Sequence, residues 1–595
     1  MSAAPHRDPE PGSRGEPRPA RVLVPSYPYE EGPARGVLSP FEPGTRLLPA
    51  GFRLAPGFLP LPVPVVLEKD VPVALRDGTT IRTDVFRPEG TAPVPVVVAW
   101  SPYGKSGGSA PSTTSLFGML GMDNGALSGL EKFEGPDPAY WCAHGYAICN
   151  PDPRGIARSE GDSYLWDRQE GRDCHDLIEW LAGQKWCSGR VGMSGTSYLA
   201  ASQWFTAAER PPHLAAINPW EGVSDVYRDL VRRGGMPDLG FARQLQRNFR
   251  GTGRREDVVA EAEEHPRFDA LWAGKAPDLE RITVPAYVVA SYSNTLHTQG
   301  TFRAWRRISS PEKWLRVHAT QEWPDYYDET NREDLRRFFD HYLKGEDNGW
   351  EETPRVRYAT LDLHGTDRVN LPADAFPPAG VVHERFHLDA ASRTLRREAP
   401  AEAGTVTYET GPAALGQVSF LLGFDEETTL VGHPKLRLWA AAEDADDMDL
   451  FVLVRKLDAN GTPLQQFNVP GRGAHLQDVT EHGASVLRYK GANGRLRVSA
   501  RRLDPRLSTD EIPAHTFDTT EKLAPGEIAE VEIDLSPVGL VFHAGETLRL
   551  VVGGRDPLGP LMPGVPPLVP ANRGRHVLHT GGTRASYLQL PVKRA

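Results

Sequence analysis

Residues 190–204 read Arg-Val-Gly-Met-Ser-Gly-Thr-Ser-Tyr-Leu-Ala-Ala-Ser-Gln-Trp, and this stretch decides the fold. It predicts a short strand, a tight turn and a helix that begins with small and apolar residues. A serine at such a turn is held out of the sheet beside the first amides of the helix, which is the setting of a nucleophile. Ser197 is the first candidate, because the apolar helical run starts directly after it and Gly195 lets the two backbones approach. Ser194 is the rival, since Leu199 stands where a strict G-x-S-x-G motif has glycine. A strand-to-helix turn without chemistry is the alternative.

The segments around this turn alternate between strand and helix patterns. Val96 to Trp100 is a continuous apolar run, and Gly145 to Cys149 repeats the pattern. Such runs are typical of strands buried on both faces of a parallel sheet. Apolar residues at helical spacing follow between Asp173 and Leu181. We therefore predict a doubly wound α/β domain over residues 61–348.

Three other regions differ from this pattern. Residues 223–282 are polar, charged and helix-prone, and we expect a helical cap inserted into the α/β domain. Residues 350–595 hold many short strands separated by turn signals, which predicts an all-β sandwich. Residues 1–60 are rich in proline and glycine; we expect an arm on the body, with the first twenty residues disordered.

Composition narrows the classes of function. The chain has 595 residues, a net charge of −11 and a pI near 5.9, so nucleic acid and anionic membranes are not expected partners. The apolar runs are too short to cross a bilayer, and the first twenty residues lack the apolar core of a secretory signal. The four cysteines show neither a disulfide framework nor zinc-ligand spacing. We expect a cytoplasmic protein that needs no cofactor or metal; a homodimer is compatible with the sequence.

Several further motifs carry a resemblance to a known family. They are Val73 to Gly78 followed by Asp84 to Pro88, Ser101-Pro102-Tyr103-Gly104-Lys105, Asp152-Pro153-Arg154-Gly155, Ser159-Glu160-Gly161, Gly195-Thr196-Ser197-Tyr198-Leu199 and Phe338 to Gly345. This sequence resembles the family of the cocaine esterases, glutaryl acylases, α-amino-acid ester hydrolases and Xaa-Pro dipeptidyl-peptidases. The resemblance implies an α/β-hydrolase with a helical cap and a C-terminal jelly roll. It favours Ser197 over Ser194, with Ala200 where the family usually has glycine.

The resemblance also implies an oxyanion hole. A tetrahedral acyl intermediate places charge on one oxygen, which two preorganised donors must stabilise. The amide of Tyr198, directly after the nucleophile, is one donor. The family takes the second from a tyrosine hydroxyl, and Tyr103 stands at that position of the motif.

The general base is expected late in the domain, because α/β-hydrolases carry the triad in the order serine, acid, histidine. Trp314 to His318 is a short strand that ends in histidine, so His318 is the predicted base. His297 is the runner-up, and His341 is expected to serve packing.

The acid does not match the pattern. The family has aspartate after the strand that corresponds to Pro285–Ala290, whereas this chain has Asn294 there, or Ser293 if the alignment shifts by one residue. Asparagine can hold an imidazole but cannot stabilise imidazolium by charge. Three explanations stay open: a displaced carboxylate from Glu322, Asp325 or Asp328, a site in which Asn294 suffices, or a protein that no longer hydrolyses.

The predicted function is hydrolysis of an acyl ester or amide through a Ser197 acyl-enzyme with His318 as base, on a small-molecule or peptide substrate. Xaa-Pro dipeptide release is the second choice. A biosynthetic acyl transferase or cyclase, and a non-catalytic binding scaffold, are the remaining alternatives because of Asn294.

Overall fold

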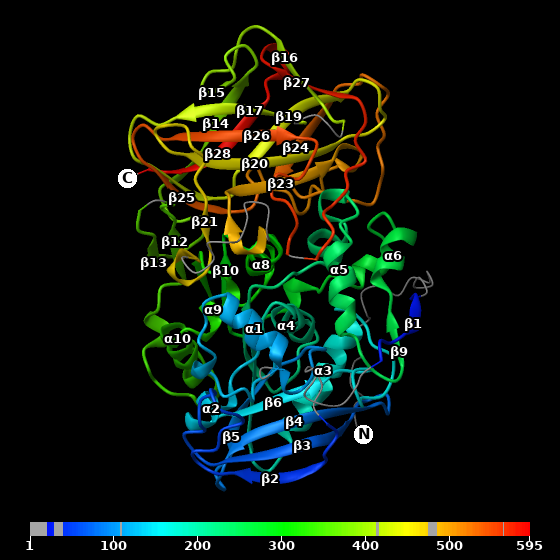
Figure 1. Ribbon diagram of the computed structural model, residues 1–595, viewed down its shortest axis with the longest axis vertical. Helices are drawn as coiled ribbons and strands as arrows, with labels where there is room; N and C mark the ends of the chain where they lie inside the picture. Colours follow the sequence, from blue (N-terminus) through cyan, green and yellow to red (C-terminus); the bar gives the residue numbers. More distant parts are fainter. Residues whose placement is uncertain are drawn as a thin grey trace, which may run out of the picture.

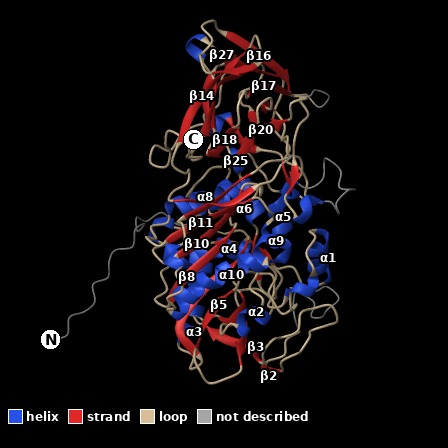
Figure 2. Ribbon diagram, turned by 90° about the vertical axis from the view of Figure 1, so that its left-hand side faces the viewer, coloured by secondary structure: helices blue, strands red, loops and turns tan. Residues whose placement is uncertain are grey.

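We describe the protein from a computed structural model, over residues 21–28, 40–107, 110–363, 365–411, 416–473, 485–562 and 564–594. The predicted disorder of the first twenty residues lies outside this described part. Figure 1 shows an elongated molecule in which an α/β unit and a β unit are stacked end to end. Figure 2 shows helices gathered around the strands of the α/β unit and strands dominating the other.

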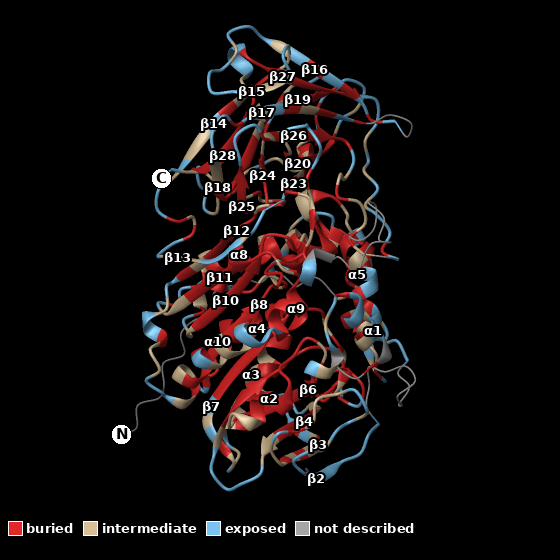
Figure 3. Ribbon diagram, turned by 60° about the vertical axis from the view of Figure 1, so that its left-hand side comes forward, coloured by how far each residue is buried: buried red, intermediate tan, exposed pale blue. Residues whose placement is uncertain are grey.

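An 11-stranded sheet forms the centre of the α/β unit. Its middle strands run parallel, as the apolar runs predict, and antiparallel strands close both ends. Figure 3 shows the sheet as the most continuous buried region of this unit. In spatial order the strands are β13 (Arg368–Ala373), β12 (Val356–Thr360), β11 (Lys313–His318), β10 (Ala286–Ser291), β8 (Leu214–Trp220), β7 (Cys187–Thr196), β5 (Val94–Val98), β6 (Ala147–Asp152), β4 (Thr80–Pro88), β3 (Val65–Ala74) and β2 (Gly44–Leu48).

Helices flank this sheet, and α3 illustrates why they form. Asp167 caps its first turn by accepting from the amide of Glu170, and Gly171 lets it approach α4, because a Cβ there would lie 2.5 Å from the carbonyl oxygen of Phe205. The helices are α1 (Pro111–Met119), α2 (Pro138–Ala143), α3 (Arg168–Ala182), α4 (Tyr198–Ala208), α8 (Thr298–Arg307), α9 (Glu322–Tyr327) and α10 (Glu329–Phe339). Among the described residues, no helix is both long and apolar enough to span a membrane.

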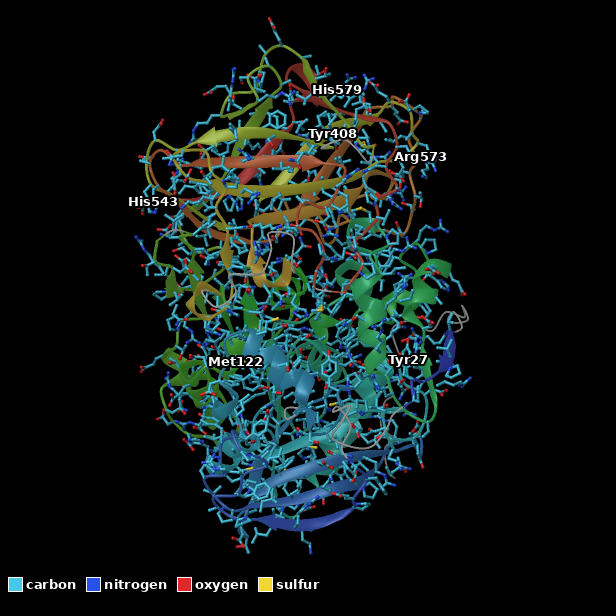
Figure 4. All side chains as sticks on the ribbon, in the orientation of Figure 1. Tyr27, Met122, Tyr408, His543, Arg573 and His579 are labelled. Carbon is cyan, nitrogen blue, oxygen red and sulfur yellow. The ribbon has the colours of Figure 1, made fainter. Side chains whose placement is uncertain are left out.

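The region predicted as a helical cap contains short helices and one strand. It holds α5 (Gly240–Leu245), β9 (Arg254–Glu256), α6 (Val258–Glu264) and α7 (Ala270–Ala273). Its strand β9 pairs antiparallel with β1 (Leu23–Pro25) of the N-terminal arm, and the Arg255 guanidinium lies 4.5 Å from the ring centre of Tyr27, which Figure 4 labels beside β1. The arm is therefore bound to the cap, and its β2 extends the central sheet.

The second unit is all-β, which confirms the predicted jelly-roll class. Thirteen strands form one extended sheet system with mostly antiparallel pairing. They are β14 (Val381–Asp389), β15 (Thr394–Arg396), β16 (Gly404–Glu409), β17 (Gln417–Gly423), β18 (Thr428–Gly432), β19 (Lys435–Ala442), β20 (Asp449–Leu457), β23 (Ala492–Arg497), β24 (Ala529–Asp534), β25 (Val538–Phe542), β26 (Thr547–Gly553), β27 (Arg575–Thr580) and β28 (Tyr587–Lys593); β21 (Gln466–Phe467) and β22 (Arg488–Tyr489) form a separate ribbon. Short 3₁₀ or π turns occupy Asn124–Ala126, Tyr227–Val231, Arg233–Gly235, Gln246–Asn248, Leu279–Arg281, Asp340–Lys344, Trp350–Glu352, Pro470–Gly473, Ser485–Leu487, Val498–Ala500 and Gly582–Arg584.

The two units meet beside β12. The central sheet continues through β12 and β13, past the boundary expected at residue 348. Leu361 donates its amide to Gly539 of the β unit at 2.9 Å, and His543, labelled in Figure 4, pairs with Asp362 at 2.8 Å. The β unit is thus joined to the central sheet at the edge where the parallel strands β10, β11 and β12 have their carboxyl ends.

Candidate active site

The strand–turn–helix predicted around Ser197 forms between β7 and α4. Ser197 is the N-cap residue of α4 and has the strained backbone angles φ 55° and ψ −112°. Gly195 makes the turn possible, because a Cβ on it would lie 2.6 Å from the Cβ of Leu199. The backbone amide of Ser197 donates to the carbonyl of Glu221 at 2.9 Å, which fixes the elbow against the end of β8.

Ala200 stands where glycine is usual, and Gly222 supplies the space that it needs. A Cβ on Gly222 would lie 2.8 Å from the Cβ of Ala200. The close approach between α4 and the segment after β8 is therefore kept, with the glycine on the other partner. The departure from the strict motif has a structural compensation.

Ser194, the rival nucleophile, lies within β7 and is 1% exposed. Its hydroxyl donates to Asn218 at 2.9 Å and lies 2.9 Å from the hydroxyl of Tyr326. These contacts belong to packing inside the sheet.

The histidine at the Ser197 hydroxyl is His297. Its Nε2 lies 3.4 Å from the Ser197 Oγ, at the long end of hydrogen-bonding range. Such contacts often shorten only when substrate is bound. His297 follows β10 and is the N-cap residue of α8, and its own amide donates to the side-chain oxygen of Asn294 at 3.2 Å.

Glu322 provides the carboxylate behind this histidine. It is the first residue of α9, and its Oε2 lies 3.0 Å from the Nδ1 of His297. A proton on Nδ1 donated to Glu322 leaves the lone pair of Nε2 facing Ser197, which is the tautomer that a general base needs. Both side chains are buried, with 3% and 4% of their surface exposed.

The prediction that His318 is the base is therefore wrong in geometry. His318 ends β11 as expected, but its Nε2 lies 2.8 Å from Glu221 and 3.3 Å from Asp325. The prediction assumed the chain order serine, acid, histidine. Here the loop after β10 carries the histidine and the segment after β11 carries the acid, so the two positions are exchanged.

Asn294 has a supporting position. Its Oδ1 accepts from the amides of Leu296 and His297, and its Nδ2 donates to Glu322 Oε2 at 3.3 Å. It holds both the loop and the carboxylate, and the displaced-carboxylate explanation fits best. Of the other two carboxylates considered, Asp325 pairs with Arg316, and Asp328 caps α10.

The two predicted oxyanion donors lie beside the nucleophile. The hydroxyl of Tyr103 interacts with that of Ser197, and burial raises the pKa of Tyr103 well above its usual value, so the hydroxyl keeps its proton. The Tyr103 ring packs edge-on against Tyr198, with centroids 5.7 Å apart. The amide of Tyr198 opens α4 directly after Ser197.

Glu134 is a site residue that sequence reasoning missed. It is 2% exposed and accepts from the Trp323 Nε1 at 3.0 Å, and its carboxyl lies near Ser197 and Tyr198. Burial, together with the negative charge of Glu322, raises the pKa of Glu134 well above its usual value. Burial therefore favours the neutral form of this carboxyl. Nothing in the pattern around Glu134 marks it, because its position comes from a loop at φ 70° that reaches under the elbow.

A cavity of about 320 Å³ opens onto the Ser197 hydroxyl. Its lining comes from α1, the cap and the β unit, and is mostly apolar. Lining residues include Leu116, Phe133, Phe241, Leu245, Trp323, Leu561 and Met562. Substrate would therefore meet the catalytic groups in a largely apolar space formed by all three regions.

Glu221, His297 and Glu322 place ligand-type atoms within 4.8 Å of one another. Both ring nitrogens of His297 already face partners, Ser197 on one side and Glu322 on the other. The donor set therefore fits a hydrogen-bonded triad better than a metal centre.

Comparison with known proteins places this site in a family. Residues 77–248 match the family model of X-Pro dipeptidyl-peptidase (S15 family), and residues 348–589 match that of the X-Pro dipeptidyl-peptidase C-terminal non-catalytic domain. A crystal structure of a CocE/NonD family hydrolase from Staphylococcus aureus is 34% identical, with a TM-score of 0.84 over 93% of this chain and 97% of that one. The chain belongs to the CocE/NonD family.

Two further similar proteins are one relative by sequence and one neighbour by fold. Cocaine esterase from Rhodococcus sp. is 34% identical over 162 residues, which are 27% of this chain and 25% of that protein. An α-amino acid ester hydrolase of known structure shares the fold, with a TM-score of 0.66 at 17% identity over 89% of this chain and 96% of that one. The family names indicate a hydrolase of the serine esterase or peptidase type.

Proposed function

We propose that the protein is a serine hydrolase that cleaves acyl esters through a Ser197 acyl-enzyme, with His297 as general base and Glu322 as the triad acid. The observation that carries this proposal is the continuous chain of contacts from Ser197 Oγ through His297 to Glu322 Oε2. A strained nucleophile, a base in hydrogen-bond reach and a group that orients the base are the elements of nucleophilic catalysis.

The reaction follows from these positions. Ser197 Oγ attacks the ester carbonyl carbon as its proton passes to His297 Nε2. His297 then gives that proton to the departing alkoxide, and the ester C–O bond breaks to leave the acyl-enzyme. Water attacks the acyl carbon as His297 takes its proton; the bond from that carbon to Ser197 Oγ then breaks, the carboxylic acid leaves, and His297 returns the proton to Oγ. Glu322 stabilises the imidazolium in both halves.

The oxyanion is stabilised by the Tyr103 hydroxyl and the Tyr198 amide. Glu134 shares this corner, and its carboxyl must be neutral there, since a carboxylate would repel the developing charge. Its raised pKa is consistent with that requirement. We assign Glu134 to the wall of the oxyanion hole.

The lining of the cavity favours an ester of an apolar acyl group. Xaa-Pro dipeptide release needs a charged clamp for the substrate ammonium. Glu134 is the carboxyl closest to such a role, and its raised pKa, which favours the neutral form, makes it a weak clamp. The transferase and scaffold alternatives rested on Asn294, and the carboxylate of Glu322 weakens that argument.

A substrate panel tests this proposal. Wild type and Ser197→Ala are assayed against p-nitrophenyl esters of acetate, butyrate, octanoate and benzoate, and against Xaa-Pro p-nitroanilides. We expect ester turnover that Ser197→Ala abolishes, with anilide kcat/KM lower by about 100-fold or more. Faster turnover of an Xaa-Pro anilide would reverse the order of the two functions, and no Ser197-dependent turnover on any substrate would contradict the proposal.

A further inference from the structure

A second cavity of about 180 Å³ lies behind the loop that carries His297. It is bounded by that loop and α8, by the cap, and by the β unit near β23 and β24. Asn294 and Leu296 line both cavities and stand between them. One water needs roughly 10–15 Å³ of such space, so this cavity has room for a small organic molecule.

Arg306 on α8 enters this cavity without a carboxylate partner. Its one contact through the guanidinium, in the described part of the chain, is with the Nε2 of His433 at 3.2 Å. Burial lowers the pKa of Arg306 to about 10, and burial keeps His433 neutral by lowering its pKa well below the usual value. Among the described residues the guanidinium thus has no carboxylate within ion-pair distance, although the charge of Asp534 acts on it and raises its pKa against the effect of burial.

The other arginines around the cavity differ from Arg306 in this respect. Each has a carboxylate within ion-pair distance. These pairs are Arg228 with Asp225, Arg233 with Asp238, Arg303 with Asp229, Arg307 with Glu280, and Arg495 with Asp238 and Asp556. Each neighbouring arginine thus has an acid within ion-pair distance, with Asp238 shared by Arg233 and Arg495, whereas Arg306 has none among the described residues.

Asp534, at the end of β24, faces the same cavity and is also unpaired. Its buried Oδ1 has no hydrogen-bond partner among the described residues, and no cation lies within 4.0 Å of its carboxylate there. Burial raises its pKa to about 6, so it is ionised at neutral pH. The hydroxyls of Tyr292 and Thr295, on the same lining, are likewise buried without a described partner.

Two opposite charges therefore face one cavity; each shifts the pKa of the other, but among the described residues no ion-pair contact within 4.0 Å joins them. Desolvated charges are costly, and a buried ion is tolerated best when a partner completes it. We propose that this cavity binds a small zwitterion, an α-amino acid or short peptide, with its carboxylate on Arg306 and its ammonium on Asp534. The Tyr292 and Thr295 hydroxyls would complete the hydrogen bonds. The site is separate from the Ser197 cavity and does not depend on catalysis.

The chain offers a matched pair of variants for the test. Arg306→Gln removes the unpaired cation, whereas Arg307→Gln removes its neighbour on the same helix, which is already paired with Glu280. Calorimetric titration of the full chain carrying Ser197→Ala uses leucine, N-acetylleucine and leucinamide at constant ionic strength. N-acetylleucine lacks the ammonium, and leucinamide lacks the carboxylate. Glycine and glycylleucine replace leucine in parallel titrations, so that side-chain size is varied.

We expect at least one zwitterion to bind, and both half-ligands to bind at least about tenfold more weakly. Arg306→Gln and Asp534→Asn should each weaken binding at least about tenfold, and Arg307→Gln should leave it within about threefold. The midpoint of thermal unfolding without ligand checks folding; we expect Arg306→Gln to be at least as stable as its parent, since it removes a desolvated charge. No binding of any zwitterion, equal loss in both arginine variants, or a destabilised Arg306→Gln would overturn the proposal.

Discussion

His297 and His318 follow neighbouring parallel strands, and both are buried beside glutamate, yet their surroundings differ. His297 lies between Ser197 and Glu322 and lines the cavity of about 320 Å³. His318 faces Glu221 and Asp325 and does not line that cavity. Both histidines lie near the end of a sheet strand. Of the two, His297 is the one that contacts the nucleophile and lines the cavity.

The comparison shows what a strand end can and cannot specify. Parallel strands deliver their following residues to one edge, so several histidines and acids gather there. Which of them acts depends on the few residues that turn each side chain after the strand. The Asn294 side chain performs that task for His297 by accepting the amides of the loop.

The largest expected effect separates the two histidines. His297→Gln should lower kcat/KM for a p-nitrophenyl ester by about 10⁴-fold or more, because it removes the base. His318→Gln should lower it by less than about tenfold. Steady-state kinetics on variants that match wild type in circular dichroism make the measurement, and comparable losses in both variants would break the distinction.

The next largest expected effect separates the carboxylates of Glu322 and Asp325. Glu322→Gln should lower kcat by about 10²–10⁴-fold with a small change in KM, since it removes the charge that stabilises imidazolium. Asp325→Asn, one turn later on α9, is the matched control, and its loss should stay below about tenfold. A stronger effect in Asp325→Asn would assign the triad acid to Asp325, beside His318.

Tyr103→Phe tests the oxyanion hole beside Ser197. Removal of one oxyanion donor costs about 10²–10³-fold in kcat. We expect a loss of this size with KM nearly unchanged, measured on the same ester. A loss that appears only in KM would mean that Tyr103 binds substrate and does not stabilise the oxyanion.

The smallest expected effect is on the pH dependence of the free energy of unfolding, and it comes from Glu221, the partner of His318. Burial raises the pKa of Glu221 to about 7, above its value in the unfolded chain. The folded state therefore keeps a proton that the unfolded state loses between about pH 4.5 and 7, and the free energy of unfolding falls as pH rises through this window, by up to about 1.4 kcal/mol per pH unit. Urea unfolding at pH 5, 6 and 7 measures this dependence, and Glu221→Gln should flatten it. If the free energy of unfolding of Glu221→Gln changed with pH as in wild type, Glu221 would not be the group responsible.

The sequence predicts the fold and the elbow better than the rest of the site. Apolar runs such as Val96 to Trp100 specify buried parallel strands, and small residues around Ser197 specify the turn, because both depend on local chemistry. The exchange between His297 and Glu322 was not predicted, since chain order was taken as a guide and two histidines lie near the ends of neighbouring parallel strands, His318 as the last residue of β11 and His297 in the loop after β10. Glu134 carries no local signal at all, as only tertiary structure brings its loop under Ser197.

Active-site labelling tests the central claim most directly, because it needs no substrate. Wild type, Ser197→Ala, His297→Gln and His318→Gln are treated with a fluorophosphonate probe, and the adduct is followed by intact mass. We predict one adduct per chain in wild type and His318→Gln at similar rates, none in Ser197→Ala, and labelling slowed at least about 100-fold in His297→Gln. Fast labelling of His297→Gln together with loss of labelling in a folded His318→Gln would contradict the account.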